Sequence, residues 1–207
     1  MPEFTGFPKI ARMSRAIVTE KIDGTNAQVY IVEQDGYALE GVVYESGGLA
    51  MYVGSRKRWI TPEHDNFGFA AWCLEHGDEL LQLGPGRHFG EWWGQGIQRG
   101  YGLKEKRFSL FNTIRWCLHD EEPQRIVTGN PTQEKYQERL PACCGLVPIL
   151  YQGPFDTVMI DDVLGRLESC GSMAAPGFSS PEGVVVYHIA ANTAFKKTLG
   201  DDGHKGA

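Results

Sequence analysis

Two β-forming runs meet at a short turn near the amino terminus, and a lysine stands at the junction. The first run ends in Lys21, Asp23-Gly24 follows, and the second run covers residues 27–32. Because Asp-Gly is a frequent hairpin signal, the junction predicts a tight turn that holds Lys21 in a fixed direction. An amine held in line with its target gains most as a nucleophile. From these residues alone, a solvated lysine in a hairpin is at least as good an interpretation.

The rest of the chain indicates mixed α and β structure without internal repeats. We expect a three-stranded meander over residues 16–45 with a hairpin turn at 34–36, and a helix over residues 62–83 that buries Phe69, Leu74, Leu80 and Leu81. Further strands are expected at 88–93, 107–112, 182–189 and 193–199, and further helices at 132–140 and 156–169. The Gly-rich loop 94–102 lacks the G-x-G-x-x-G spacing, which excludes a Rossmann dinucleotide site.

Composition restricts the class of protein. With 207 residues, 42% of them hydrophobic, the chain is ample for one core and short for two full domains. No apolar run approaches the roughly 20 residues that span a bilayer, and residues 1–4 carry no signal-peptide pattern. Five cysteines without a C-x-x-C pair indicate neither a disulfide scaffold nor a zinc ribbon. We therefore expect a cytoplasmic enzyme domain with reduced thiols and no membrane partner; for a bacteriophage protein this is the host cytoplasm.

The charges are distributed unevenly along the chain. A net charge of −6 argues against a nonspecific nucleic-acid binder, whose affinity comes from neutralising phosphates. Basic residues nevertheless gather at 56–58, at 104–107 and at 196–197, whereas acids cluster at 120–122 and 161–162. This separation fits a local basic strip that steers an anionic partner to one face.

Six short motifs follow the order found in covalent nucleotidyltransferases, the superfamily of polynucleotide ligases and mRNA capping enzymes. Residues 21–26, Lys-Ile-Asp-Gly-Thr-Asn, resemble motif I of the RNA ligase 2-like family, whereas DNA ligases more often carry Arg at the position of Asn26. Ser55-Arg56 resembles motif Ia. Residues 89–98 resemble motif III and include the Gly-x-Gly-Ile-Gln extension of RNA ligases. The remaining motifs are IIIa at residues 107–112, IV at 181–186 and V at 194–197. Motif V departs from the family's Lys-x-Lys, because Lys196 and Lys197 are adjacent.

The resemblance implies an α+β fold of the ATP-grasp-like ligase adenylation type, with mainly antiparallel sheets flanked by helices. It implies that Lys21 becomes covalently attached to AMP, with ATP and Mg²⁺ or Mn²⁺ as cofactors. The expected nucleotide-binding residues are Glu20, Ile22, Asn26, Arg56, Glu91, Phe108, Glu182, Lys196 and Lys197. Phe108 would stack on adenine, and Lys196 is preferred over Lys197 for the triphosphate. The expected metal ligands are Asp23, Glu91 and Glu182.

The chemistry of these side chains agrees with such roles and also offers plain alternatives. A lysine amine is protonated near neutral pH, and partial burial or nearby positive charge favours the neutral, nucleophilic form. Carboxylate oxygens are the ligands that Mg²⁺ prefers. Each carboxylate can instead be an ordinary surface acid, and Asp23 a turn residue. Arg56 can belong to a solvated basic face, and Phe108 to the core, since it alternates with Ser109 along the expected strand.

The expected function is that of an ATP-dependent RNA ligase. Lys21 would take AMP from ATP and pass it to a 5′-phosphate end of RNA. A 3′-hydroxyl end would then displace AMP and close the strand. The alternatives are a DNA ligase, a capping-type guanylyltransferase, or a non-catalytic module that binds nucleotides or RNA ends. We expect a single adenylation domain over residues 1–207 with a mobile tail at 200–207, because no OB-fold or helical domain follows motif V.

Overall fold

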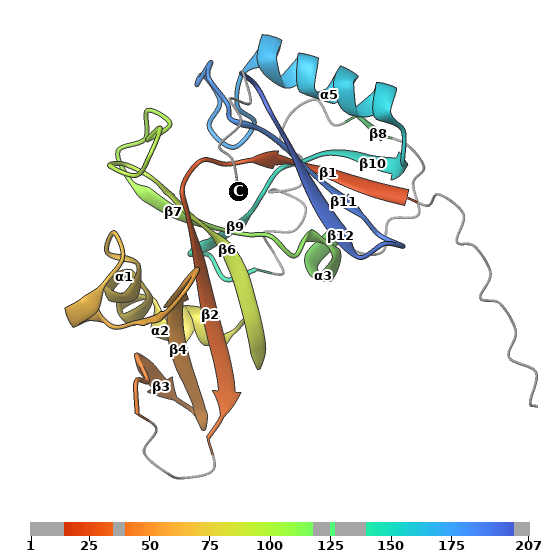
Figure 1. Cartoon of the computed structure of the whole chain (residues 1–207). Coiled ribbons are helices and arrows are strands. Elements are labelled where there is room, and N and C mark those ends of the chain that lie inside the picture. The colour runs from red at the N-terminus through yellow and green to blue at the C-terminus, as the bar shows by residue number, and fades with distance from the viewer. Residues whose placement is uncertain (1–14, 35–39, 118–124, 127–139, 201–207) are drawn as a thin grey trace, which may run out of the picture.

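The strands of the computed structural model, which describes residues 15–34, 40–117, 125–126 and 140–200, form two sheets (Figure 1). The first sheet has the order β12-β11-β1-β10-β8, and the second has the order β3-β4-β2-β6-β7-β9, with β5 paired to β4. The strand pairs are antiparallel except for β7 and β9, which run parallel. The prediction of an α+β fold with mainly antiparallel sheets flanked by helices is confirmed.

One long helix covers the first sheet. Across this sheet the strands are β12 (Thr193–Thr198), β11 (Gly183–His188), β1 (Arg15–Lys21), β10 (Ile149–Pro154) and β8 (Arg125–Ile126). Helix α5 (Thr157–Cys170) begins at Asp156, whose carboxylate accepts a hydrogen bond from Val158 N, as an N-cap residue does. Val18, Val184 and Val186 pack against its buried face, so one side of this sheet is closed.

Two short helices cover the second sheet. Its strands are β3 (Tyr44–Ser46), β4 (Leu49–Ser55), β2 (Thr25–Glu33), β6 (Gly86–Gly94), β7 (Lys106–Leu110), β9 (Cys144–Leu146) and β5 (Trp59–Ile60). The two covering helices are α1 (Phe69–Glu75) and α2 (Gly77–Leu81); the short η1 (Pro62–His64) precedes them, and α3 (Thr113–Cys117) follows β7. Val29 and Ile31 of β2 join Phe69 and Leu80 in one apolar cluster. Because side chains alternate along a strand, the residues between them face the opposite side of the sheet.

The predicted meander over residues 16–45 is wrong, although its strands exist. β1 pairs with β10 and β11, whereas β2 pairs with β4 and β6, so the two strands belong to different sheets. The chain crosses between the sheets at Gly24, where a Cβ atom would lie 2.5 Å from Trp92 O and 2.7 Å from Trp93 Cβ. Only glycine fits this close approach. Lys21 therefore ends a strand at the junction of two sheets and does not belong to a hairpin.

The predicted helix over residues 62–83 is divided into η1, α1 and α2. Phe67 and Gly68 have φ angles of 53° and 78°, and a left-handed backbone cannot continue a right-handed helix. Phe69, Leu80 and Leu81 are buried as predicted. Leu74 is 45% exposed, because it lies on the outer side of α1.

The elements predicted after residue 87 agree with the structure better than those predicted before it. The strands predicted at 88–93, 107–112, 182–189 and 193–199 are β6, β7, β11 and β12, and the helix predicted at 156–169 is α5. The turn at 35–36, the helical residues 132–139 and the tail 201–207 lie outside the described residues, as do residues 1–4. Among the described helices, none has the length and apolar character needed to span a membrane.

Candidate active site

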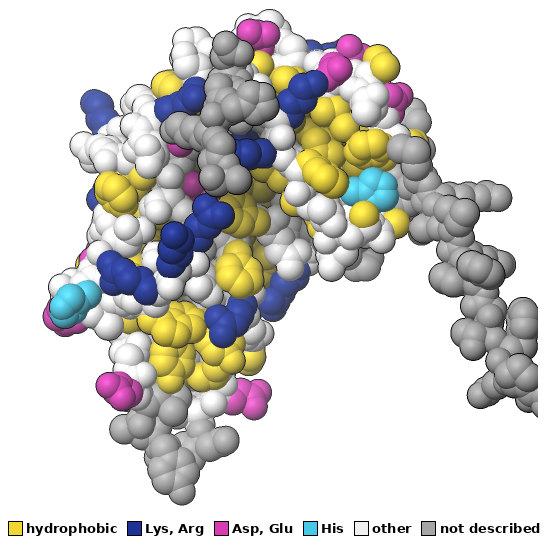
Figure 2. All heavy atoms as spheres, viewed as in Figure 1, with side chains coloured by type: hydrophobic (Ala, Val, Ile, Leu, Met, Phe, Trp, Pro, Cys, Tyr) yellow, Lys and Arg dark blue, Asp and Glu magenta, His cyan; other side chains and the backbone are white. Residues whose placement is uncertain are grey.

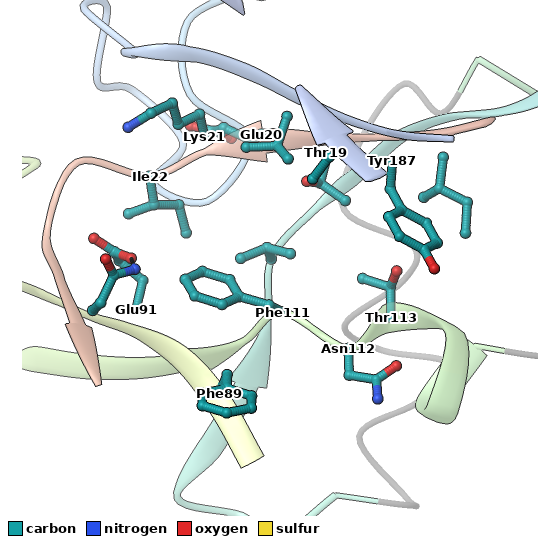
Figure 3. Close-up of a pocket in the computed structure, with 15 residues that line it drawn as sticks. Thr19, Glu20, Lys21, Ile22, Phe89, Glu91, Phe111, Asn112, Thr113 and Tyr187 are labelled. Atoms are coloured by element: carbon teal, nitrogen blue, oxygen red, sulfur yellow. Dashed lines mark hydrogen bonds between the residues drawn. The ribbon is translucent and has the colours of Figure 1, made fainter. Parts of the chain in front are cut away.

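A cavity of about 520 Å³ opens between the two sheets, on the faces that α1, α2 and α5 leave uncovered (Figure 3). Lys21 and Glu91 lie at one end of it, Asn112 and Thr113 lie at the other, and Phe111 lies between these ends. Its other lining residues are Ile17, Thr19, Glu20, Ile22, Asn26, Phe89, Val147, Val185, Tyr187 and Ala194.

Strand alternation turns Lys21 toward the cavity. Ala16 and Val18 of β1 pack beneath α5, whereas Ile17 and Thr19 line the cavity. Since successive side chains of a strand point to opposite faces, Lys21 shares the face of Ile17 and Thr19. The lysine thus stands at the end of a central strand that is paired on both sides.

The amine of Lys21 contacts a carboxylate from the neighbouring strand. Lys21 Nζ lies 2.5 Å from Glu182 Oε1, and the two side chains are 24% and 18% exposed. Strand register explains the contact, because Lys21 is paired with Gly183 at the start of β11. Gly183 has a φ of 151°, and a Cβ atom there would collide with the carbonyl oxygen of Lys197. Glu182 Oε2 is buried and has no hydrogen-bond partner among the described residues.

A second carboxylate, that of Glu91, faces the same end of the cavity. Its Oε1 accepts a hydrogen bond from Gly24 N at 3.0 Å, and its Oε2 accepts one from Asn26 Nδ2 at 3.3 Å. Burial raises the pKa of Glu91 to about 7, although the Gly24 N–H and the charge of Lys21 oppose the shift. Glu91 therefore changes its protonation state near neutral pH, at the same end of the cavity as Lys21.

The two lysines of β12 lie on opposite faces of their strand. Lys196 is paired with Val185, which lines the cavity, whereas Lys197 is paired with Val184, which packs beneath α5. Directly paired residues share a face, so Lys196 belongs to the cavity face. Lys197 Nζ forms an ion pair with Asp161 on α5. The register thus places Lys196, but not Lys197, on the cavity face, although Lys196 is not among the residues that line the cavity.

Comparison with known proteins now decides the family. Residues 14–198 match the sequence model of the RNA ligase family. This chain belongs to the RNA ligase family.

Solved structures of a family member share the fold. An apo variant of the Naegleria gruberi RNA ligase superposes with a TM-score of 0.56 at 18% identity, covering 90% of this chain and 49% of that chain. A variant of the same ligase with ATP and Mn has a TM-score of 0.54 at 17% identity, covering 96% of this chain and 57% of that chain. The chain thus spans about half the length of these ligases.

A shorter similarity joins this chain to a curated protein. The protein nucleotidyltransferase YdiU of Pectobacterium atrosepticum is 35% identical over 78 residues, which are 37% of this chain and 16% of that protein.

In this RNA ligase-family chain, Glu20 lines the cavity but its carboxylate is held by a loop. It accepts hydrogen bonds from Ser172 Oγ at 2.5 Å, Met173 N at 2.7 Å and Ala174 N at 2.9 Å. Burial raises the pKa of Glu20, and these three hydrogen bonds oppose the shift. In this structure the carboxylate therefore fastens the loop that follows α5 to the strand of Lys21.

Asp23 is not among the residues that line the cavity, and its carboxylate has a cationic partner. Arg99 Nε donates to Asp23 Oδ2 at 3.0 Å, and Arg99 Nη1 donates to Ser180 O at 2.8 Å and Pro181 O at 3.1 Å. The hydroxyl of Tyr101 accepts a hydrogen bond from Asp23 N at 2.8 Å, and burial raises the pKa of Tyr101. Arg99 and Tyr101 are not among the residues predicted from the sequence. The available signal was a cation inside the Gly-rich loop 94–102.

The aromatic residue predicted to stack on adenine requires a correction. The ring of Phe108 is 1% exposed and lies 4.9 Å from the ring of Phe69 in the apolar core, so it offers no face to a ligand. Phe111, just after β7, is 40% exposed and lines the cavity (Figure 3). Alternation along the strand had placed Phe108 and Phe111 on opposite faces, and packing against α1 decided which face is buried.

Arg56 also lies outside the cavity lining. It is exposed and follows β4, whose last residue Ser55 is paired with Ala27 of β2. Arg56 is therefore near the end of the second sheet that carries Asn26, one strand farther from the cavity.

Glu182 and Glu91 are the carboxylates near Lys21 that could hold a divalent cation. Glu182 Oε2 is a buried oxygen without a described hydrogen-bond partner, and Glu91 faces the same end of the cavity. Mg²⁺ and Mn²⁺ prefer such oxygen ligands. Burial raises the pKa of Glu91, and a cation beside this carboxylate would favour its charged form.

Proposed function

We propose that this chain is an ATP-dependent RNA ligase that forms a covalent lysyl-AMP intermediate on Lys21. The observation that carries the proposal is the 2.5 Å contact between Lys21 Nζ and Glu182 Oε1 beside a cavity of about 520 Å³. Cavities of roughly 300–1,000 Å³ are typical of small-molecule sites. A strand-end amine next to a proton acceptor and such a cavity suits covalent catalysis.

In the first step the neutral amine of Lys21 attacks the α-phosphorus of ATP. The nitrogen–phosphorus bond forms while the bond to the pyrophosphate oxygen breaks, and pyrophosphate leaves. Glu182 Oε1 lies within hydrogen-bond reach of Lys21 Nζ and is the acceptor that we assign for the amine proton. Lys196, on the cavity face of β12, stabilises the negative charge that develops on the leaving oxygens.

The nucleoside occupies the middle of the cavity. Phe111 offers an exposed ring on one side, and Ile22 and Val147 add apolar surface. We assign to Phe111 the stacking contact with the adenine base. Asn26 and Glu91 are hydrogen-bonded to each other at the rim and lie near the ribose.

Mg²⁺ or Mn²⁺ would be held by Glu182 and Glu91, with Asp23 as a further candidate if it leaves Arg99. When bound, the cation supplies positive charge that lowers the cost of a neutral nucleophile and of a charged leaving group.

The later steps join RNA ends. The AMP group passes from Lys21 to a 5′-phosphate end, and a 3′-hydroxyl end then displaces AMP to form a phosphodiester. Membership of the RNA ligase family supports this substrate class. Since the chain spans about half of the ligases it matches, the first step is assigned to the described residues and the sealing steps are tested separately.

The deciding experiment uses labelled ATP with Mg²⁺ or Mn²⁺ and the full chain. Wild type should form an acid-labile protein adduct, and Lys21→Ala should form none. Competition with unlabelled GTP and NAD distinguishes an ATP-specific ligase from a capping-type enzyme, and a chase with nicked RNA or nicked DNA identifies the acceptor. Reversible ATP binding without an adduct would leave only a nucleotide-binding module and refute the proposal.

A further inference from the structure

The cavity-side face of the second sheet continues past the cavity as a surface of aromatic and basic side chains. Along β2 and β6, Gln28 is paired with Phe89 and Tyr30 with Arg87, directly beyond the pair of Asn26 and Glu91. Paired residues two positions apart lie on one face of the sheet. We call this surface the aromatic strip; its residues are Gln28, Tyr30, Tyr52, Trp59, Arg87 and Phe89.

Three rings of the aromatic strip pack together on neighbouring strands. Tyr30 is paired with Tyr52, and Trp59 of β5 lies across β4 at Gly54. The rings of Tyr30 and Trp59 are stacked, with centroids 6.1 Å apart and planes inclined by 21°. Trp59 is 46% exposed and Phe89 is 49% exposed. Large flat side chains thus lie open to solvent on a rigid sheet that leads to the cavity.

A cation is fixed on top of these rings. Arg87 Cζ lies 4.1 Å from the ring centroid of Tyr30 and 5.3 Å from that of Trp59, within the range of cation–π contacts. Arg87 Nη1 donates to Gln28 Oε1 at 3.1 Å, and Gln28 Nε2 donates to Ser55 O at 3.3 Å. Arg87 is exposed, so its remaining N–H groups can reach a ligand.

The charge of this face is positive where the cavity ends. Between Glu91 at the cavity and Glu45 at the far edge, the described face residues of β2, β4, β5 and β6 include no carboxylate. The exposed residues Arg56 and Lys57 add two cations in the turn before Trp59, whereas Arg58 donates to His64 O and Asp65 O. Figure 2 shows hydrophobic side chains gathered over β2 and β4 with Lys and Arg side chains beside them.

We propose that the aromatic strip binds the RNA strand that leads out of the cavity, a step that rests on the proposed function. Unpaired bases stack on the exposed ring of Trp59, which the ring of Tyr30 supports, and phosphates meet Arg87, Arg56 and Lys57. Exposed rings beside arginines are the usual surface for unpaired RNA, whose bases offer π-faces and whose backbone is anionic. Arg87 precedes Glu91 by four residues on β6, about 13 Å at strand spacing, so only nucleotides beyond the reacting end reach Arg87 and Trp59.

The test compares two 5′-phosphorylated RNAs, a dinucleotide and a single-stranded 12-mer, bound by the full chain. Trp59→Ala combined with Tyr30→Ala should weaken binding of the 12-mer about 10-fold or more, the loss expected for removal of base stacking, and should leave the dinucleotide unaffected. Arg87→Gln should also reduce the salt dependence of 12-mer binding. Leu74→Ala is the matched control, because Leu74 is 45% exposed on the outer side of α1.

Adduct formation with labelled ATP separates this proposal from the proposed function. The proposal is supported if the Trp59→Ala/Tyr30→Ala variant and the Leu74→Ala control both form the adduct and only the double variant binds the 12-mer more weakly. An adduct together with unchanged 12-mer affinity, or equal losses for the dinucleotide and the 12-mer, overturns it while the proposed function stands. Absence of an adduct from wild type refutes the proposed function itself. Circular dichroism of the variants excludes misfolding as the cause of weaker 12-mer binding. The single variant Trp59→Phe keeps an aromatic ring and should bind the 12-mer as wild type does.

Discussion

Lys21 Nζ lies 2.5 Å from Glu182 Oε1, and the pairing of β1 with β11 creates this contact. The two residues are 161 positions apart in sequence, and only the antiparallel register, with Lys21 opposite Gly183, brings them together. The other oxygen of Glu182 is buried without a described partner, so the same carboxylate can hold the amine on one side and a cation on the other.

Glu182→Gln should slow formation of the lysyl adduct by about 100-fold or more, the usual contribution of a positioned proton acceptor. The amide has nearly the shape of the carboxylate but accepts a proton poorly and does not attract a cation. The rate of labelled-AMP incorporation measures the effect. Glu168→Gln, at an exposed position on α5, is the matched control and should incorporate AMP at the wild-type rate. A wild-type rate in Glu182→Gln would contradict the assigned role.

The ligand-free protein should lose stability between about pH 4.5 and about pH 7. Burial raises the pKa of Glu91 to about 7, so the folded state keeps this proton to a higher pH than the unfolded state, and ionisation of Glu91 then favours unfolding. Urea unfolding of wild type and Glu91→Gln at both pH values measures the difference. Between these pH values the free energy of unfolding should fall by up to about 3 kcal/mol more in the wild type than in the variant, since one pKa unit corresponds to about 1.4 kcal/mol. Glu20 remains in both proteins, and identical pH dependences would refute the prediction.

Phe111→Ala and Phe108→Ala should have opposite effects. Phe111 lines the cavity and is 40% exposed, so its truncation should raise the KM for ATP about 10-fold with little loss of stability. Phe108 is 1% exposed in the core, so its truncation should cost about 3–5 kcal/mol of unfolding free energy. Adduct kinetics and urea unfolding of both variants check the pair. A raised KM in a fully stable Phe108→Ala protein would restore the assignment made from the sequence.

Lys196→Ala should reduce the rate of adduct formation about 100-fold, because it removes a cation from the cavity face of β12. Lys197→Ala should leave that rate nearly unchanged. It removes only the exposed ion pair with Asp161, which is worth at most about 1 kcal/mol. Single-turnover rates with labelled ATP compare the two, and equal losses would show that strand register does not distinguish the lysines.

The sequence by itself determined the strands that carry several of the candidate site residues. Lys21 ends an apolar β-forming run, and the Val-rich run after Glu182 is a strand, because local propensity and flanking glycines suffice to specify such elements. Glu91 was likewise predicted within a strand, and β6 carries it.

Only the tertiary structure decided which face of each strand borders the cavity. Alternation assigns Phe108 and Phe111, or Val184 and Val185, to opposite faces, but it does not say which face a helix covers. Pairing between distant strands also separated β1 from β2 into two sheets. Contacts of this kind depend on long-range burial, which no local run of residues encodes.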